Sequence, residues 1–220
     1  IGGLIMTHSD DDGLVLPPRL APAQVVILPV IHKENDRAVV LDYCARLAAE
    51  LRALTYDGHP VAVEIDAREG RGGEKVWHWI KKGVPLRLEV GPRDIAGDSV
   101  FMGRRDKPHK ERRGVPRAEL TATLVNLLDE IQNALLERAR AMRDKHTLRI
   151  DDRQAFYDFF TPQNPDKPEI HGGFALTHWG HDAEAEETLK RDLSVTARCI
   201  PLDLPEEPGV CPFSGKPSAR

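Results

Sequence analysis

The residues best suited to chemistry are arginines, and the first of them lies in a strand-like segment. Residues 86–90 read Leu-Arg-Leu-Glu-Val, between Gly83-Val-Pro85 and Gly91-Pro92. The alternation of apolar and polar side chains predicts a strand with one buried and one exposed face. Arg87 is expected on the exposed face, where its guanidinium would be available to an anionic partner.

A basic run follows this strand closely. Between Arg104 and Arg117 the chain has seven Lys or Arg residues and two acids. The seven are Arg104, Arg105, Lys107, Lys110, Arg112, Arg113 and Arg117. Such a run is either a solvated loop or a surface for an anion. The net charge of the chain is −4, and this argues mildly against binding of nucleic acid, for which a basic domain is the usual sign.

Composition limits the class of protein. The chain has 220 residues, 40% hydrophobic and 30% charged, as expected for a soluble protein of one large or two small domains. No apolar run approaches the roughly 20 residues of a membrane helix, and no signal peptide is visible. Three cysteines are too few for a disulfide scaffold, so a cytoplasmic location is expected. The chain opens at Ile1 without a methionine, which suggests a piece of a longer polypeptide.

The elements that must position the basic residues form a regular series. The apolar run 24–31 predicts a strand buried on both faces. Other strands are predicted at 14–16, 61–65, 84–90 and 100–102, and helices at 37–54, 74–82 and 116–145, the first of them capped by Asn35 or Asp36. This order predicts an α/β fold, a mixed sheet flanked by helices.

A second, smaller α+β unit is predicted after His146. Its expected parts are a short aromatic segment at 150–160, a loop at Pro162, Pro165 and Pro168, strands at 172–176 and 195–200, and an acidic helix at 182–191.

Several sequence blocks in series resemble the C-terminal portion of prolyl-tRNA synthetase. They are residues 13–22, 24–29, 83–94, 104–106, 198–201 and 211–217. The resemblance implies four parts: the tail of a class II catalytic domain with a linker (1–23), an anticodon-binding α/β domain (24–125), a connecting helix (126–145) and a C-terminal α+β domain of the archaeal/eukaryote-like type (146–220).

The same resemblance implies an activity for the parent enzyme, a homodimer that uses ATP to attach proline to tRNA. Two of the three class II signatures are absent here, and the ATP-binding arginine of the third would lie just before Ile1. His8 and the acids Asp10–Asp12 match the rim of that active site, where an ordinary turn is an equal alternative. This part alone is therefore expected to be catalytically incomplete, without a cofactor, and free to be a monomer.

Binding of tRNA(Pro) through its anticodon is the implied role of this part. Proline anticodons share two adjacent guanines, and arginine can donate two parallel hydrogen bonds to guanine O6 and N7. The resemblance places Arg87 at a guanine and Lys110, within one to three residues, at a neighbouring contact. The remaining anticodon-binding candidates are Arg104, Arg105, Lys107 and Trp77, the last as a stacking surface. A surface ion pair with Glu89 or Asp94 is the alternative for Arg87.

Two departures from the family pattern stand out. Ile80 replaces a glutamate that accepts a hydrogen bond from guanine, and His78 or Glu74 could substitute for it. The four cysteine positions of the family's zinc site are Gly180, Ala185, Cys211 and Ser214, so only one ligand is left. Tetrahedral zinc needs four good donors. We therefore expect a metal-free domain with Cys199 buried as a small apolar residue.

Three other interpretations are open. A free-standing RNA-binding module could reuse this domain, and the anticodon domains of the histidyl, threonyl and glycyl enzymes share the fold. Pro17-Pro18-Arg19 and the C-terminal domain argue against the latter. A nucleotide-binding protein would need a glycine-rich loop directly after its first strand, and Gly70-Arg-Gly-Gly73 lies too far along the chain.

Overall fold

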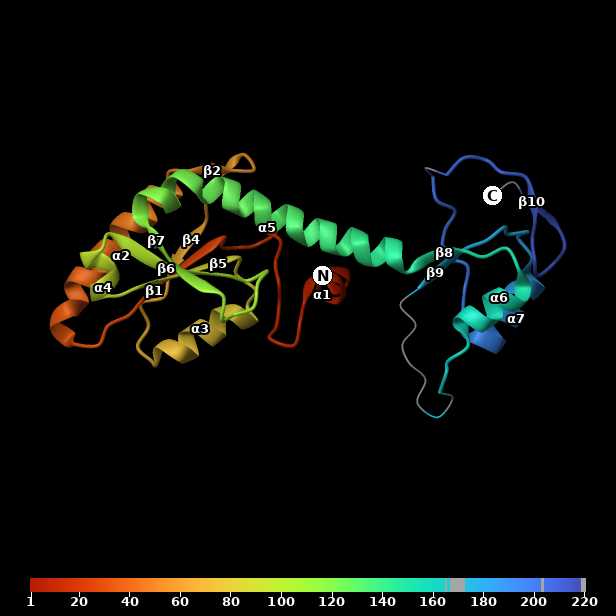
Figure 1. Ribbon diagram of the computed structural model, residues 1–220, viewed down its shortest axis with the longest axis horizontal. Helices are drawn as coiled ribbons and strands as arrows, with labels where there is room; N and C mark the ends of the chain where they lie inside the picture. Colours follow the sequence, from red (N-terminus) through yellow and green to blue (C-terminus); the bar gives the residue numbers. More distant parts are fainter. Residues whose placement is uncertain (165, 167–172, 203, 219–220) are drawn as a thin grey trace. The chain divides into compact units, whose positions relative to one another are not determined.

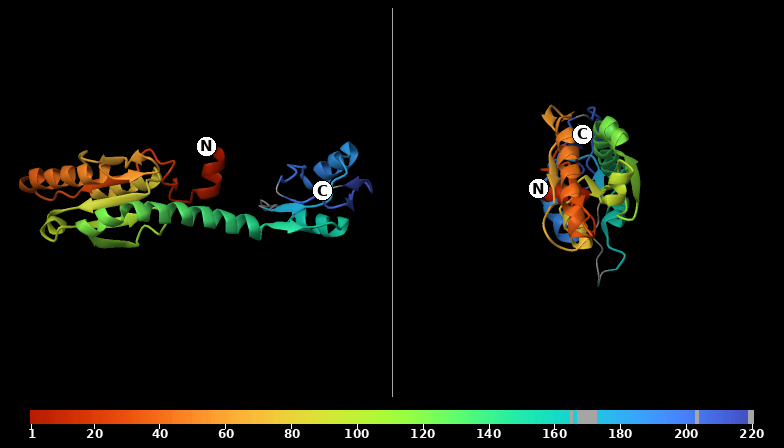
Figure 2. Two further views of the ribbon diagram at one scale, coloured as in Figure 1. Left: turned by 90° about the horizontal axis from the view of Figure 1, so that it is seen from above. Right: turned by 90° about the vertical axis from the view of Figure 1, so that its left-hand side faces the viewer.

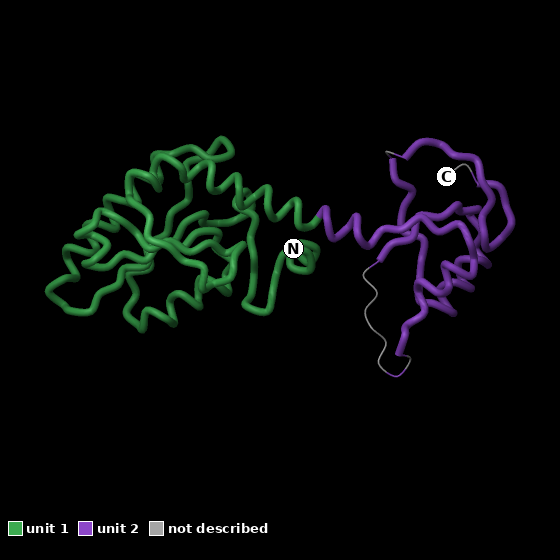
Figure 3. Tube along the Cα trace, in the orientation of Figure 1, with its two compact units in different colours: residues 1–139 green, residues 140–220 purple. Residues whose placement is uncertain are grey.

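The computed structural model describes residues 1–164, 166, 173–202 and 204–218. The chain divides into two compact units, residues 1–139 and 140–220 (Figure 3). Pro165, Pro168 and Gly172, named above in a predicted loop and strand, lie outside the described residues. No helix in the described part is both long and apolar enough to span a membrane.

A five-stranded mixed sheet forms the centre of unit 1 (Figure 1). Its order is β4 (Val63–Ile65), β1 (Val25–Pro29), β5 (Leu86–Val90), β6 (Ser99–Arg104) and β7 (Arg112–Pro116). β1 is parallel to β4 and β5, whereas β6 is antiparallel to both of its neighbours, β5 and β7. The predicted α/β fold is confirmed. β7 was not predicted, because only Val115 of this edge strand is buried and no alternation is visible in the basic run.

Helices cover both faces of the sheet. They are α2 (Arg37–Arg52, after the 3-10 turn η1, Glu34–Asp36), α3 (Gly72–Lys81), α4 (Pro92–Ala96) and α5 (Arg117–Lys145). The larger core joins alternate residues of β1 and β5 to the apolar stripes of α2 and α5. On the other face Val26 and Leu28 pack against Val76 and Trp79 of α3. Figure 2 shows the sheet between these helices. Asp36 precedes α2, but its side chain makes no capping hydrogen bond.

Residues 14–16 do not form the predicted strand. They follow α1 (Gly2–His8) and a turn that is closed by a backbone bridge between Asp10 and Gly13. The amides of Leu14 and Leu16 then donate to the carbonyl oxygens of Lys81 (3.0 Å) and Gly83 (3.1 Å). Because the partner is the end of a helix, two hydrogen bonds form here but no ladder.

Unit 1 is completed by the short hairpin β2 (Thr55–Tyr56) and β3 (His59–Pro60). Unit 2 contains β8 (Thr147–Arg149) parallel to β9 (Phe174–Leu176), the helices α6 (Arg153–Phe160) and α7 (Ala183–Leu193), and the hairpin β10 (Gly209–Val210) and β11 (Pro217–Ser218).

The smaller α+β unit is confirmed, and its two helices have side-chain caps. Asp152 and Asp182 accept hydrogen bonds from amides in the first turns of α6 and α7. The predicted strand at 195–200 is wrong. That segment pairs with no strand in the part of the chain that the structure describes.

Candidate nucleic-acid interface

Arg87 lies in β5, the middle strand of the sheet, and only 2% of the residue is exposed. Its expected exposure is wrong: β5 is an inner strand with β1 and β6 paired along its two edges, and the face that carries Arg87 is covered as well. A strand covered on both faces buries its polar residues too. Opposite Arg87 on β6 is Gly103, where an ideal Cβ would lie 3.0 Å from Arg87 Nη2. The absent side chain of Gly103 therefore leaves room for the guanidinium.

Among the described residues, no carboxylate forms an ion pair with the guanidinium of Arg87. Glu89 instead accepts from Arg112 Nη1 at 2.7 Å, and Asp94 accepts from the Gly91 amide at 2.8 Å. Neither Nη1 nor Nη2 of Arg87 has a hydrogen-bond partner among the described residues, and both atoms are buried. Burial, and next to it the charge of Arg105, lowers the pKa of Arg87 to about 10. An unpaired buried charge is unfavourable, so this site favours a ligand that offers acceptors.

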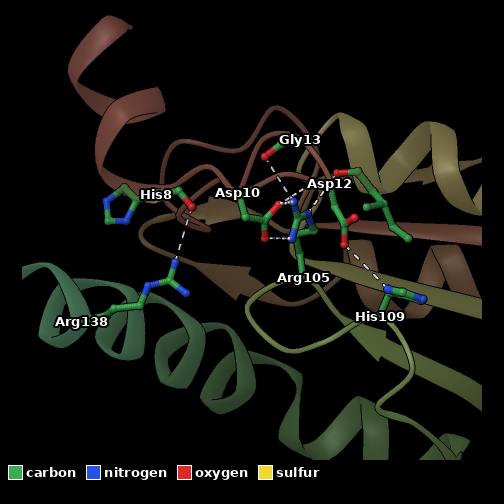
Figure 4. A network of polar contacts seen from close by, with 8 residues as sticks. His8, Asp10, Asp12, Gly13, Arg105, His109 and Arg138 are labelled. Atoms are coloured by element: carbon green, nitrogen blue, oxygen red, sulfur yellow. Dashed lines mark hydrogen bonds and ion pairs between the residues drawn. The ribbon is translucent and has the colours of Figure 1, made fainter. Parts of the chain in front are cut away.

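Arg104 and Arg105, in contrast, are fully engaged within the protein. Arg104 makes two parallel hydrogen bonds to Asp106 (2.9 and 2.8 Å) and a third to Glu130 of α5 (3.2 Å). Arg105 is 5% exposed and bonds Asp10 through both terminal nitrogens (Figure 4). The geometry gives these two arginines structural roles and leaves them few donors for a ligand.

The exposed members of the predicted set surround α3 and the loop between β6 and β7. Lys107 and Lys110 are exposed in this loop. Trp77 of α3 is 40% exposed, and its ring lies 5.1 Å from the ring of His109 in the same loop. A surface hollow of about 760 Å³ lies along α3. It is lined by Arg71, Gly73, Glu74, Trp77, His78 and Lys81.

The helical geometry of α3 directs Trp77 and Trp79, which are two residues apart in sequence, to different sides. Trp79 points to the core and donates through Nε1 to Asp66 at 2.8 Å, so only Trp77 is available for stacking. Ile80 is 1% exposed and packs inward. His78 and Glu74, the residues expected to substitute for the missing glutamate, both line the hollow. Burial, followed by the charge of Arg68, lowers the pKa of His78, which favours a neutral imidazole.

His8 lies at the end of α1, away from the hollow. Its carbonyl oxygen is 3.5 Å from Arg138 Nη2 (Figure 4). Burial, and after it the charge of Arg138, lowers the pKa of His8. Its assignment to the rim of an active site stays a prediction.

Three of the four positions that correspond to the family's zinc site come together in unit 2. An ideal Cβ on Gly180 would lie 2.8 Å from Ser214 Oγ and 3.1 Å from Cys211 Cβ. Within the described ranges, no three His, Cys, Asp or Glu residues gather as a metal site would require. Cys199 is exposed and Cys211 is buried, so the expectation of a buried Cys199 is wrong.

Sequence reasoning missed two contributors to this surface. His109 links Trp77 to Asp12, whose carboxylate lies 3.7 Å from His109 Nδ1. Arg112 lies beside Arg87, since its Cγ is 3.3 Å from the ideal Cβ position of Gly103. Both residues belong to the basic run, but only the sheet register shows which of its members meet α3 and β5.

Comparison with known proteins identifies the class first. The anticodon binding domain family matches residues 24–127, which contain the sheet, α3 and the basic loop. The family of the prolyl-tRNA synthetase C-terminal domain matches residues 167–220. By both matches and by the relatives below, the chain is similar to the C-terminal portion of prolyl-tRNA synthetases, with an anticodon-binding domain followed by a C-terminal domain.

Its curated relatives are similar along the whole chain. Proline–tRNA ligase 2 of Anaeromyxobacter dehalogenans is 58% identical over 100% of this chain and 44% of its own length. The proline–tRNA ligase of Protochlamydia amoebophila is 48% identical over 98% of the chain and 43% of its own length. The proline–tRNA ligase of Bdellovibrio bacteriovorus is 48% identical over 100% of the chain and 43% of its own length. The chain thus spans less than half the length of these relatives.

Proposed function

We propose that this chain is the tRNA-binding part of a proline–tRNA ligase, and that it binds tRNA(Pro) through the anticodon loop. The relatives carry the name of this activity, and the anticodon binding domain family matches the domain that contains the candidate surface. In the whole protein, residues outside this chain attach proline with the use of ATP. The same proposal includes a cytoplasmic location and a homodimeric whole protein. It also includes a monomeric state of this chain alone and a C-terminal domain without metal.

The observation that carries the proposal is the unpaired guanidinium of Arg87. Two of its neighbours, Arg104 and Arg105, are bonded to carboxylates, whereas both Nη atoms of Arg87 lack a partner within the described structure. Guanine O6 and N7 are two acceptors at the spacing of these two donors. Binding of a guanine edge would satisfy both nitrogens at once.

Arg112 provides the route by which a base reaches Arg87. Its side chain is 37% exposed and lies beside Arg87 on Gly103. It is held by an ion pair to Glu89 and by the Phe101 ring, whose centroid is 5.2 Å from its guanidinium carbon. Partly exposed contacts of these two kinds contribute at most about 1 kcal/mol each, so Arg112 can turn outward at a small cost in free energy. In this proposal Lys107 and Lys110 contact phosphate or base, Trp77 stacks on a base, and Arg104 and Arg105 hold the loop in place.

Substitution of Arg87 by lysine tests base reading. Arg87→Lys keeps the charge but loses the parallel pair of donors. We expect it to reduce the preference for a hairpin with a proline anticodon, over one with a guanine replaced by adenine, by about 1–3 kcal/mol. Lys107→Ala should weaken binding of both hairpins about equally and reduce its salt dependence.

The measurement is filter binding of the 220-residue chain to both hairpins across salt concentrations. Equal losses of discrimination for the two variants would contradict base reading by Arg87. Absence of binding by the unsubstituted chain would contradict the proposed function itself.

A further inference from the structure

The segment Asp10–Leu16 is joined to the elements of the candidate interface along its whole length. Leu14 and Leu16 donate to the backbone at the end of α3, as described above. An ideal Cβ on Gly13 would lie 2.6 Å from Lys81 Cα, and one on Gly83 would lie 2.6 Å from the Leu14 carbonyl oxygen. The two backbones therefore touch, and a side chain at either glycine would force them apart.

Arg105 connects this segment to two further parts of unit 1. It follows β6 directly and begins the loop that contains Lys107, His109 and Lys110. Its Nε donates to the Ile80 carbonyl oxygen of α3 at 3.0 Å. Its Nη1 and Nη2 donate to the Asp10 carboxylate, and Nη2 also reaches the Gly13 carbonyl oxygen at 3.2 Å. One buried side chain thus holds the basic loop, α3 and the N-terminal segment together.

A second connection exists but is weaker. His109 contacts Trp77 on one side and approaches Asp12 on the other, at 3.7 Å. Both ends of this ion pair are 40% exposed, so it contributes little. The Asp10–Arg105 pair is buried at its arginine end, and removal of one partner from such a pair is strongly unfavourable. Arg105 is therefore the main link.

We propose that Arg105 is a positioning residue that couples RNA binding at the β6–β7 loop to the N-terminal segment Asp10–Leu16. This inference rests on the proposed function. RNA contacts at Lys107 and Lys110 hold the loop in one conformation, which holds Arg105 against Asp10 and strengthens the attachment of the segment. Because coupling between sites is reciprocal, loss of the Asp10–Arg105 pair must weaken RNA binding, although Asp10 is an acid.

Two neighbouring acids make a matched test, because simple electrostatics and coupling predict opposite signs. Asp10→Asn removes a negative charge near the RNA surface, and charge alone would then tighten RNA binding. Coupling predicts instead that binding of the proline-anticodon hairpin weakens by about fivefold or more. Asp11→Asn removes the same charge at the next residue. The Asp11 side chain is exposed, and no ion pair to it is found in the described structure. This control should bind the hairpin as tightly as the unsubstituted chain, or slightly more tightly.

Asparagine at position 10 preserves the local turn. Its side-chain oxygen can still accept the hydrogen bond from the Asp12 amide, now 3.0 Å from Asp10 Oδ1. Thermal unfolding of both variants checks that unit 1 stays folded. As a second arm, Arg105→Lys should weaken hairpin binding, and Asp10→Asn should weaken it no further in that background.

Hydrogen exchange of the 220-residue chain provides a readout that does not depend on affinity. In the unsubstituted chain the hairpin should slow exchange of the Leu14 and Leu16 amides, and in Asp10→Asn this protection should disappear. The inference fails if Asp10→Asn binds the hairpin as tightly as Asp11→Asn, or if the hairpin leaves these two amides unprotected. Failure of the unsubstituted chain to bind the hairpin would instead overturn the proposed function, and this inference with it.

Discussion

Three arginines in or directly next to the sheet have three different environments. Arg104 is neutralised by Asp106 and Glu130, Arg105 by Asp10, and Arg87 has both Nη atoms buried and unpaired within the described structure. Since guanidinium chemistry is identical in all three, only the environment distinguishes a residue that holds the fold from one poised to bind. Proteins often retain such unfavourable groups where function requires them.

Arg87→Met should therefore stabilise the free chain while it impairs RNA recognition. Methionine has a similar length and no charge, so it removes the desolvation penalty at a site that is 2% exposed. We expect the free energy of unfolding of unit 1 to rise by about 1–3 kcal/mol, as when buried charges are replaced by apolar groups. Urea unfolding with and without the hairpin measures both effects. A destabilised variant would show that an unrecognised partner satisfies Arg87.

Asp66 gives a prediction of pH dependence. Its side chain is fully buried and accepts hydrogen bonds from Arg68 and Trp79. The Arg68 hydrogen bonds, the largest cause, and that of Trp79 hold the pKa of Asp66 well below its usual value despite burial. A lowered carboxyl pKa contributes stability that is complete above about pH 4, where the unfolded chain is ionised, and that is lost as pH falls toward the folded pKa.

Asp66→Asn should cost about 1.5–3 kcal/mol at pH 7, the contribution of hydrogen bonds to a charged group. The difference from the unsubstituted chain should shrink by about 1 kcal/mol at pH 3. Urea titrations at the two pH values, followed by tryptophan fluorescence, test this. A difference that is the same at both would mean that Asp66 contributes by shape and not by charge.

At the scale of elements, the site depends on the junction between α3, β5 and the N-terminal segment. α3 ends at Lys81, and Gly83 reverses the chain with a φ of +74° before β5 begins at Leu86. The left-handed conformation and the contact with Leu14 both require glycine at this position. Gly83 therefore shapes the turn that connects the helix of Trp77 to the strand of Arg87.

Gly83→Ala should destabilise unit 1 by about 2 kcal/mol or more, from backbone strain together with the clash against Leu14. Gly114→Ala in β7 is the control, because an ideal Cβ there meets no atom within 4 Å. That substitution should change stability by less than about 0.5 kcal/mol. Thermal unfolding of the two variants compares them directly, and equal shifts would remove the special role given to Gly83.

At the scale of the whole molecule, the residues proposed for recognition all belong to unit 1, and unit 2 has its own small core. Phe156 packs against Phe160 and Phe213 at ring distances of 4.8 Å, and Cys211 is buried near Gly180. Where a family uses four cysteines for zinc, this chain places a glycine, an alanine and a serine at three of the positions. Under the proposal that unit 2 binds no metal, packing and the capped helices α6 and α7 supply the stability that a metal would give.

A chelator should accordingly have no effect on unit 2. We expect the same thermal unfolding curve for the chain before and after dialysis against EDTA, and no shift upon addition of zinc. Metal analysis of the purified chain is the companion measurement. A decrease in unfolding temperature of several degrees after EDTA treatment, reversed by zinc, would show that Cys211 and other donors bind a metal after all.

The sequence by itself determined the elements and the class of the protein. Long periodic segments such as α2 and α5, and the apolar run of β1, depend on local patterns, because helix and strand formation follow from the spacing of apolar residues. The series of sequence blocks from residue 13 to residue 217 was enough to indicate the family. Short elements with weak patterns, among them β7 and the bridge at Asp10, could not be read from one sequence.

The tertiary structure alone decided which arginines are available. The alternation of apolar and polar residues in β5 predicted an exposed Arg87. In the structure β5 is the middle strand, and both of its faces are covered at Arg87. Arg104 and Arg105 looked like binding residues until carboxylates from Glu130 and Asp10, distant in sequence, were placed beside them. Burial and ion pairing are properties of neighbours in space, and local sequence contains no record of contacts that only folding creates.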